Sequence, residues 1–256
     1  MLLAIDRGNT NDKFVVFDND KIILESSKIQ WRFTKFFSEK KKLISEINLL
    51  FSEKNLKISD CIFSSVKSEQ DNKEFTDIIS QYYNVRQLTY TTPLPIQNMY
   101  QSNTLGMDRL AAVVGANALL GSNVLVVDAG TCITFDYLDK DKRYLGGSIS
   151  PGFKIKYEAL HNFTANLPLI NGIDEVNLVG NNTEDSIRSG VINGTIAEIE
   201  QTINLYKQKF FDVKIVITGG DSSFIKSKIG CNVTEEKNLV FWGLKNIYEF
   251  NEKSNK

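Results

Sequence analysis

The stretch Ile5-Asp6-Arg7-Gly8-Asn9-Thr10-Asn11-Asp12-Lys13 connects two apolar segments of β-forming residues near the start of the chain. Leu2 to Ile5 leads into the stretch, and Phe14 to Phe17 leads out of it. The residues between these segments favour a turn, so we predict two strands joined by a hairpin loop. Asp6 then lies at the end of the first strand, where the chain begins to turn.

The residues of this loop also suit phosphate binding. Gly8 lets the backbone approach a ligand closely. Loop N–H groups, the Thr10 hydroxyl and the Lys13 ammonium could hold a phosphate, and Asp6 could hold a hydrated magnesium ion beside it. An ordinary hairpin without a ligand is the alternative that this stretch alone leaves open.

A second copy of the pattern lies in the middle of the chain. Val124 to Val127 is a predicted strand, Asp128-Ala129-Gly130-Thr131 follows it, and Ile133-Thr134-Phe135-Asp136 begins the next strand. Both copies contain Asp-x-Gly, a nearby Thr and a following strand with Phe-Asp. The repeat predicts two related domains, residues 1–117 and 118–256, whose hairpins could grip one polyphosphate from two sides.

The composition restricts the class of protein. With 42% hydrophobic and 24% charged residues, the chain is typical of soluble globular proteins. Its net charge of -1, with the two signs interspersed, argues against nucleic-acid binding as the main function. No apolar run approaches the roughly 20 residues of a membrane span, and we expect no signal peptide before the first strand. The three separated cysteines fit a reducing cytoplasm, with neither a metal site nor a disulfide framework.

Hydrophobic periodicity predicts alternating strands and helices in the first half of the chain. Further strands are expected at residues 21–26, 61–65 and 85–88. Two helices are expected whose apolar residues span 33–51 and 75–83. This half therefore contains three strands, then helix, strand, helix and strand.

The second half repeats the strand hairpin and then becomes mainly helical. We expect a strand at residues 144–148, a helix at 153–163, a strand at 213–218 and a last helix at 239–250. The helix at 153–163 carries the single histidine, His161, which has no catalytic partner in a recognisable motif. We therefore expect His161 to be structural or solvated.

The longest periodic segment follows Thr183 and predicts a long helix with a buried face. Thr183 is the expected N-cap of this helix. Gly190 and Gly194 lie one turn apart, so we expect another helix to pack closely against it. The apolar positions step by four and three residues: Ile192, Ile196, Ile199, Ile203, Tyr206 and Phe210.

Gly106-Met107-Asp108-Arg109 precedes a helix of small residues and suggests a second group of site residues. Asp108 could act as a carboxylate base beside Arg109, whose guanidinium could bind a carboxylate or phosphate. An acidic residue in a first helical turn is also favourable without any ligand, and both interpretations can hold at once. The sequence contains no Gly-x-x-x-x-Gly-Lys-Ser/Thr loop and no Gly-x-Gly-x-x-Gly after a strand, so the two hairpins are the predicted phosphate site.

Taken together, these motifs resemble the type III pantothenate kinases, a family of the sugar kinase, chaperone and actin superfamily. The resemblance extends over nearly the whole chain, and it depends on the order and spacing of the motifs. The motifs are Asp6-Arg7-Gly8-Asn9-Thr10-Asn11, Gly106-Met107-Asp108-Arg109, Asp128-Ala129-Gly130-Thr131, Leu145-Gly146-Gly147, Ser150-Pro151-Gly152, Asn182-Thr183 and Thr218-Gly219-Gly220.

The resemblance implies an α/β fold with two ribonuclease-H-like domains, each a mixed five-stranded sheet flanked by helices. It implies a cytoplasmic homodimer that transfers phosphate from ATP to pantothenate, the first step towards coenzyme A. Magnesium and a monovalent cation, potassium or ammonium, are the implied cofactors. Neither a nucleic acid nor a membrane is an implied partner.

The resemblance also implies a role for each matching residue. The loop from Asp6 to Lys13 corresponds to the ATP phosphate site, and Thr131 closes it from the second domain. Asp108 corresponds to the general base, and Asp128 to the ligand of the monovalent cation. The implied pantothenate contacts are Tyr100, Gly106, Met107, Asp108, Arg109 and Thr183.

Two departures from the family pattern bear on these roles. Arg7 replaces a usually apolar residue, which places a charge beside the phosphates or at the surface. The spacing from Tyr100 to Gly106 is one residue short and lacks the usual proline, which weakens the assignment of Tyr100. A superfamily kinase for another small hydroxylated substrate, such as a sugar, and a non-catalytic nucleotide-binding regulator are the alternative functions.

Overall fold

The computed structural model describes residues 1–8, 12–26 and 47–254. The described chain divides into two compact units. The first unit comprises Met1–Ile96, Gln101–Ala118 and the C-terminal segment from Leu239, and the second comprises Gln97–Tyr100 and Leu119–Asn238. This division differs from the expected linear one, because the C-terminal helix belongs to the first unit.

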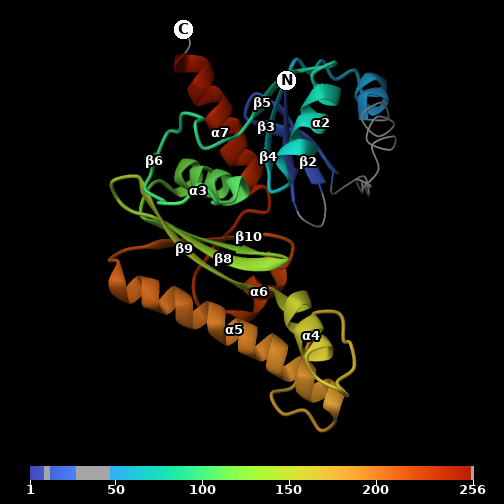
Figure 1. Ribbon diagram of the computed structural model, residues 1–256. Helices are drawn as coiled ribbons and strands as arrows, with labels where there is room; N and C mark the ends of the chain where they lie inside the picture. The colour runs from blue at the N-terminus through green and yellow to red at the C-terminus, as the bar shows by residue number, and fades with distance from the viewer. Residues whose placement is uncertain (9–11, 27–46, 255–256) are drawn as a thin grey trace. The chain divides into compact units, whose positions relative to one another are not determined.

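The first unit contains a five-stranded mixed sheet in the order β3-β2-β1-β4-β5. Figure 1 shows this sheet beside helix α2. The first three strands form an antiparallel meander, and β1, β4 and β5 run parallel to one another. This is the topology that the sequence predicts for a ribonuclease-H-like domain. The strands are β1 (Leu2–Arg7), β2 (Asp12–Asp18), β3 (Lys21–Glu25), β4 (Asp60–Ser65) and β5 (Asn84–Gln87).

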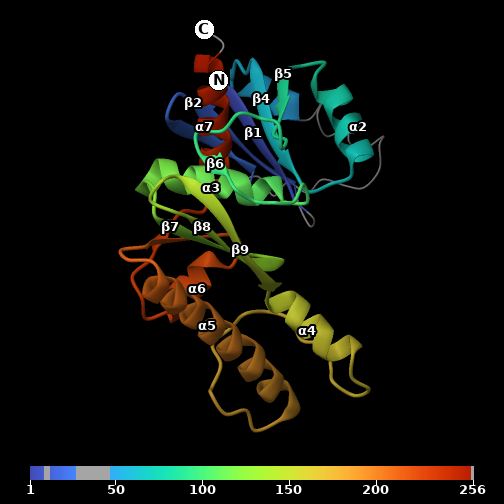
Figure 2. The same cartoon turned by 60° about the vertical axis from the view of Figure 1, so that its left-hand side comes forward.

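Helices cover both faces of this sheet (Figure 2). On one face, helix α2 (Glu69–Ile79) and a helical segment at residues 47–53 pack against the apolar side chains of β1, β2 and β4. Helix α7 (Leu239–Ser254) contacts β1 and β4, on the other face together with α3 (Met107–Leu120). Alternating strand side chains therefore point either to α2 or to the face of α3 and α7.

Helices α3 and α7 cross at two glycines. A Cβ atom added at Gly243 would lie 1.8 Å from the carbonyl oxygen of Ala111, and one added at Gly115 would lie 2.2 Å from that of Leu239. No real side chain fits at such separations, so the two backbones touch directly. Helix α3, which carries Asp108 in its first turn, is thereby fixed to the C-terminal helix.

The second unit contains a six-stranded mixed sheet in the order β11-β10-β7-β8-β9-β6. The hairpin of β7 and β8 repeats the hairpin of β1 and β2, as predicted. The expected five strands are joined by a sixth, β6, which has two residues and pairs with β9. The strands are β6 (Gln97–Asn98), β7 (Val124–Ala129), β8 (Cys132–Leu138), β9 (Arg143–Pro151), β10 (Lys214–Thr218) and β11 (Thr234–Glu235).

Three helices, α4 (Phe153–Asn162), α5 (Thr183–Lys209) and α6 (Ser222–Lys228), complete this unit. All three contribute side chains to one apolar core with β7, β8 and β10. The predicted stripe of α5 is confirmed, because Ile192, Ile199 and Ile203 are buried there.

Two details of α5 differ from the sequence-based expectation. Asn182 caps the helix, because its side-chain oxygen accepts a hydrogen bond of 2.9 Å from the N–H of Asp185. Thr183 is therefore the first helical residue, which leaves its hydroxyl free of the capping role. A Cβ atom at Gly190 or Gly194 would meet no other atom within 4 Å, so no helix of the described chain packs closely there.

Some expectations lie on residues outside the described ranges. These are Asn9, Thr10 and Asn11 of the first hairpin and most of the helix expected over residues 33–51. Within the described ranges, no helix combines the length and apolar character needed to cross a membrane.

Candidate functional site

Asp6 lies near the end of β1, in a polar position between two neighbouring strands. In the sheet register it pairs with Lys13 of β2 on one side and with Ser64 of β4 on the other. The Ser64 hydroxyl donates a hydrogen bond of 2.9 Å to Oδ1 of Asp6. Sequence analysis missed Ser64, although the polar pair at the end of a buried strand, Ser64-Ser65, was a visible signal.

The surroundings of Asp6 raise its pKa from 3.8 to about 7. Burial is the largest cause, because it disfavours the charged carboxylate, and the negative charge of Asp108 acts in the same direction. The hydrogen bond from Ser64 and the positive charge of Lys13 oppose both effects. The fold therefore brings together two predicted site carboxylates that are about a hundred residues apart in the sequence.

Asp108 is the second residue of α3. Its Oδ1 accepts a hydrogen bond of 2.9 Å from the backbone N–H of Arg109, as expected for an acidic residue in a first helical turn. A Cβ atom at Gly106 would lie 2.4 Å from the same oxygen, so only glycine leaves room for this carboxylate position. Met107 and Arg109 on either side are buried, whereas Asp108 is half-buried.

Arg7 does not occupy either position expected for it. Its side chain is 3% exposed, which excludes the surface. Its guanidinium is bonded to Asp12 of β2 and to Asp71 and Asn72 of α2. The side chains of Arg7 and Asp12 are thus engaged with each other on the α2 face, rather than directed to a phosphate, because α2 supplies the carboxylate and amide partners.

In the second unit, Asp128 has the position that Asp6 has in the first. It lies near the end of β7, opposite Thr134 of β8 and Thr218 of β10. The backbone of Gly219, at a φ of +94°, passes so close that a Cβ atom there would lie 2.5 Å from Oδ1 of Asp128. Thr131, in the turn after β7, is exposed.

Tyr100 belongs to the second unit, whereas Gly106 to Arg109 belong to the first. Its ring stacks on Tyr144 with a centroid distance of 6.2 Å. A Cβ atom at Gly146 would lie 3.1 Å from Cδ2 of Tyr100, so this glycine leaves space for the ring. Tyr100 therefore packs against β9 of its own unit.

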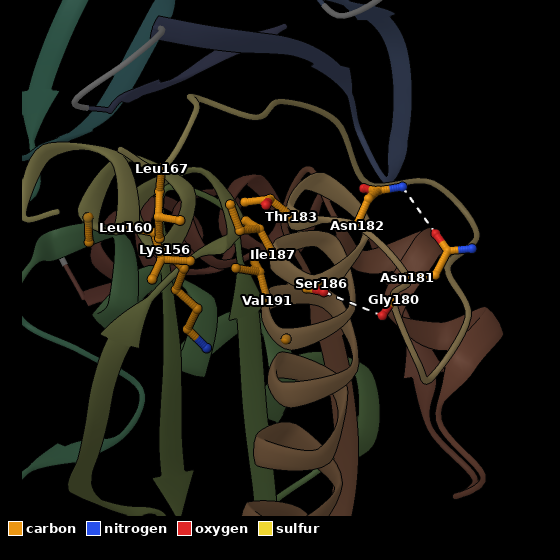
Figure 3. A pocket seen from close by; sticks show the side chains of 12 residues that line it. Lys156, Leu160, Leu167, Gly180, Asn181, Asn182, Thr183, Ser186, Ile187 and Val191 are labelled. Atoms are coloured by element: carbon orange, nitrogen blue, oxygen red, sulfur yellow. Dashed lines mark hydrogen bonds between the residues drawn. The ribbon is translucent and has the colours of Figure 1, made fainter. Parts of the chain in front are cut away.

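Thr183 is exposed and lines a pocket of about 890 Å³ in the second unit (Figure 3). Thr183, Ile187 and Val191 of α5 form one side of this pocket, and Lys156 and Leu160 of α4 contribute to its lining. The Lys156 ammonium is bonded to Thr195 and Glu198 of α5. The pocket is therefore mainly apolar, with a polar rim at the start of α5.

Among the described residues, no group of three or more His, Cys, Asp or Glu side chains is arranged to hold a metal ion. A cation at Asp6 or Asp128 would therefore need oxygen ligands from the backbone, from water or from a bound substrate. Cys61, Cys132 and Cys231 are free thiols.

The raised pKa of Asp6 predicts a pH dependence of stability. The folded protein holds the Asp6 proton more tightly than the unfolded chain, so this carboxyl lowers the free energy of unfolding as pH rises from about 4 to about 7. Asp6→Asn should remove this part of the slope and stabilise the protein near pH 8. Thermal unfolding of both proteins between pH 4 and 8, with a chelator present and without nucleotide, measures this pH dependence.

Asp18 has an exposed carboxylate at the end of β2, so Asp18→Asn is the control. This variant should retain the wild-type dependence of stability on pH. An unchanged pH dependence in Asp6→Asn would contradict the assigned surroundings of Asp6.

Comparisons with known proteins agree on one family. A sequence model of type III pantothenate kinase matches residues 2–205. The type III pantothenate kinase of Christiangramia forsetii is 39% identical over 253 residues, which cover 98% of this chain and 99% of the relative. The type III pantothenate kinase of Flavobacterium johnsoniae is 34% identical, with 98% of each chain covered.

Comparison with solved structures supports the same fold class. A proposed 2-dehydro-3-deoxygalactonokinase from Sinorhizobium meliloti superposes with a TM-score of 0.60 at 13% identity, and covers 98% of this chain and 99% of its own. At this level of identity the likeness shows the fold alone. The fold is that of the sugar kinases and actin-like ATPases.

Proposed function

This chain belongs to the type III pantothenate kinase family. We propose that Asp6 binds magnesium, that Asp108 accepts the proton of the substrate hydroxyl, and that Asp128 binds a monovalent cation. The chain is a kinase that uses ATP to phosphorylate pantothenate in coenzyme A biosynthesis. The observation that carries the residue assignment is that the fold brings Asp108 close enough to Asp6 for its negative charge to add to burial in raising the pKa of Asp6. A carboxyl group whose ionisation is opposed by a second carboxylate suits a site that also receives a cation and a proton.

In this proposal Asp108 is the general base. Its carboxylate accepts the proton of the terminal pantothenate hydroxyl while that oxygen attacks the γ-phosphorus of ATP. The bond from the γ-phosphorus to the bridging oxygen breaks, and ADP leaves. The N–H of Arg109 orients the carboxylate by its hydrogen bond, and Gly106 leaves room for this position, which favours proton transfer in a fixed direction.

The ATP phosphates are assigned to the first hairpin, residues Asp6 to Lys13, together with Thr131. Lys13 is exposed opposite Asp6 and can place an ammonium against phosphate oxygens. Arg7 and Asp12 contribute to this site through the backbone, because their side chains are engaged with each other and with α2.

Magnesium is assigned to Asp6. The fit rests on the charge of the site, because a divalent cation would relieve the repulsion between Asp6 and Asp108. When bound, magnesium supplies charge neutralisation for the phosphates. Asp6 would hold it through a carboxylate oxygen that Ser64 orients by its hydrogen bond.

A monovalent cation, potassium or ammonium, is assigned to Asp128. The carboxylate lies at a strand end beside the backbone of Gly219, and carboxylate oxygen is a ligand that suits such a cation. Such a cation would add positive charge to the nucleotide site.

Activity should therefore depend on potassium or ammonium, and Asp128→Ala should raise the KM for ATP by about tenfold, the effect of losing one charged ligand contact. Steady-state kinetics at fixed magnesium, in potassium and in sodium buffers, measures both effects. Asp174→Ala, whose carboxylate is 81% exposed in the same unit, is the matched control and should behave as the wild type. Equal activity of the wild type in potassium and in sodium would count against the site.

Pantothenate is assigned to Gly106, Met107, Asp108 and Arg109, with Tyr100 and Thr183 as further contacts. Arg109 would pair with the pantothenate carboxylate. We propose that the enzyme is a cytoplasmic homodimer in which Thr183 of one subunit reaches pantothenate held by the other. The exposed hydroxyl of Thr183 at the rim of an apolar pocket supports this assignment, because it is open to a partner.

A coupled ADP-release assay with pantothenate, a panel of sugars and acetate tests the substrate. Turnover with pantothenate alone supports the proposal. Turnover with a sugar alone would assign the chain to another substrate of the same fold.

A further inference from the structure

Arg7 is a buried cation whose side chain has no part in the reaction described above. Its side chain is 3% exposed, and its guanidinium donates hydrogen bonds of 3.3 Å to Oδ2 of Asp12, 2.6 Å to Oδ2 of Asp71 and 2.9 Å to Oδ1 of Asn72. It also bonds the backbone oxygen of Asp71 at 3.3 Å and lies 4.1 Å from the ring centre of Phe75. Burying a charge costs desolvation free energy, which is offset only where hydrogen-bond and ion-pair partners satisfy the whole charged group.

The side chains of Asp6 and Arg7 point to opposite faces of the sheet, because successive residues of a strand alternate. Arg7 points to α2, where its guanidinium lies over Phe75. Asp6 points to the other face, where the charge of Asp108 acts on it. Arg7 is thus excluded from direct contact with a group bound at Asp6.

The contacts of Arg7 join three elements at one point. Arg7 is the last residue of β1, and Asp12 is the first residue of β2 and its partner in the sheet register. Asp71 and Asn72 lie in the first turn of α2. The guanidinium therefore ties both strand ends of the hairpin to a helix that is itself packed in the core.

The next register pair along these two strands is Asp6 with Lys13, the two residues assigned to magnesium and phosphate. A shift of either strand end would move one of these side chains relative to the other. We propose that Arg7 is a positioning residue that fixes the strand ends and so sets the affinity of the site for nucleoside triphosphate. This inference rests on the proposed function of the hairpin.

In this chain the contacts at residue 7 depend on the geometry of the guanidinium. The guanidinium presents several N–H donors in a rigid plane, so it reaches Asp12, Asp71 and Asn72 at the same time and stacks on Phe75. A lysine ammonium keeps the charge but is a single point at the end of a flexible chain. Arg7→Lys therefore preserves the buried charge and loses the three-way connection.

Kinetics and ATP binding of two substitutions test the inference. We expect Arg7→Met to weaken ATP binding by about tenfold or more and Arg7→Lys by several-fold, on the scale of lost charged hydrogen bonds. The KM for pantothenate should remain within about twofold, because the Asp108 loop makes none of these contacts. Arg86→Met is the control, since Arg86 of the same unit also has a carboxylate partner, Glu252, and an aromatic one, Tyr248.

A second pair of variants changes only α2. Asp71→Asn removes a carboxylate that holds Arg7 and should weaken ATP binding in the same direction. Asp77→Asn changes an exposed carboxylate on the same helix and should leave ATP binding unchanged. A loss of melting temperature common to Arg7→Met and Arg86→Met, without a difference in ATP affinity, would reduce Arg7 to a structural residue and overturn the inference.

ATP binding is measured by calorimetry as well as through KM, so the result does not depend on turnover. If Arg7→Met does not fold, unchanged ATP affinity in both Arg7→Lys and Asp71→Asn overturns the inference. A wild-type protein that binds ATP but does not phosphorylate pantothenate would instead contradict the proposed reaction. The ATP affinities of the variants would still test the role of Arg7.

Discussion

Asp108→Asn should lower kcat for pantothenate phosphorylation by about a hundredfold or more, the scale of general-base catalysis. Asparagine has nearly the same shape and can still accept the hydrogen bond from the N–H of Arg109, but it cannot take up the hydroxyl proton. The loss should therefore appear in kcat, while ATP still binds. Steady-state kinetics and calorimetric titration with ATP measure the two effects.

Two further variants make this test specific. Asp77→Asn, an exposed carboxylate of the same unit, should retain wild-type kcat. Gly106→Ala keeps the Asp108 carboxylate but displaces its Oδ1, because the new Cβ would lie 2.4 Å from that oxygen. We expect Gly106→Ala to lower kcat as well. Near-normal turnover in Asp108→Asn would remove Asp108 from its assigned role.

Co-expression of Asp108→Asn with Thr183→Arg should restore activity that neither variant has alone. If Asp108 of one subunit and Thr183 of the other serve one pantothenate, a mixed dimer has one site with both defects and one site with neither. A two-fold interface is reciprocal, so purified mixed dimers should show about half of the wild-type activity.

The position of Thr183 makes the substitution suitable for this experiment. Thr183 is exposed at the start of α5 and does not cap the helix, so arginine should block the site without unfolding the chain. Gln201→Arg, an exposed position on the same helix, is the control and should be active without a partner variant. Differently tagged subunits allow the mixed dimers to be purified. No recovery in those dimers would place Thr183 in its own subunit's site or in none.

The strand hairpins and the α5 stripe could be predicted because their signals are local. An apolar run, a glycine-containing turn and a second apolar run specify a hairpin wherever they occur. A four-three repeat of isoleucines likewise specifies a buried helix face. Asp6 and Asp128 were found in this way, since each is at the end of such a run.

The partners of the site residues could not be predicted, because they depend on which strands become neighbours. Ser64 meets Asp6 only because β4 pairs in parallel with β1. Arg7 meets Asp71 only because α2 covers that face of the sheet. For the same reason a charged residue before Gly8 was interpreted as a surface or phosphate-facing group, when the fold buries it between two acidic residues.

The first unit is assembled from segments at both ends of the described chain, with the second unit encoded between them. During synthesis, the second unit is translated before residues 239–254. Helix α7, whose Gly243 meets α3 at Ala111, is therefore added last, to a sheet whose strands were translated first. At about 5–20 residues per second, several seconds or more pass between translation of the N-terminal sheet and translation of α7, and during this time one face of the sheet lacks that helix. We expect this interval to be the period in which the nascent chain is most exposed to aggregation and to chaperone binding.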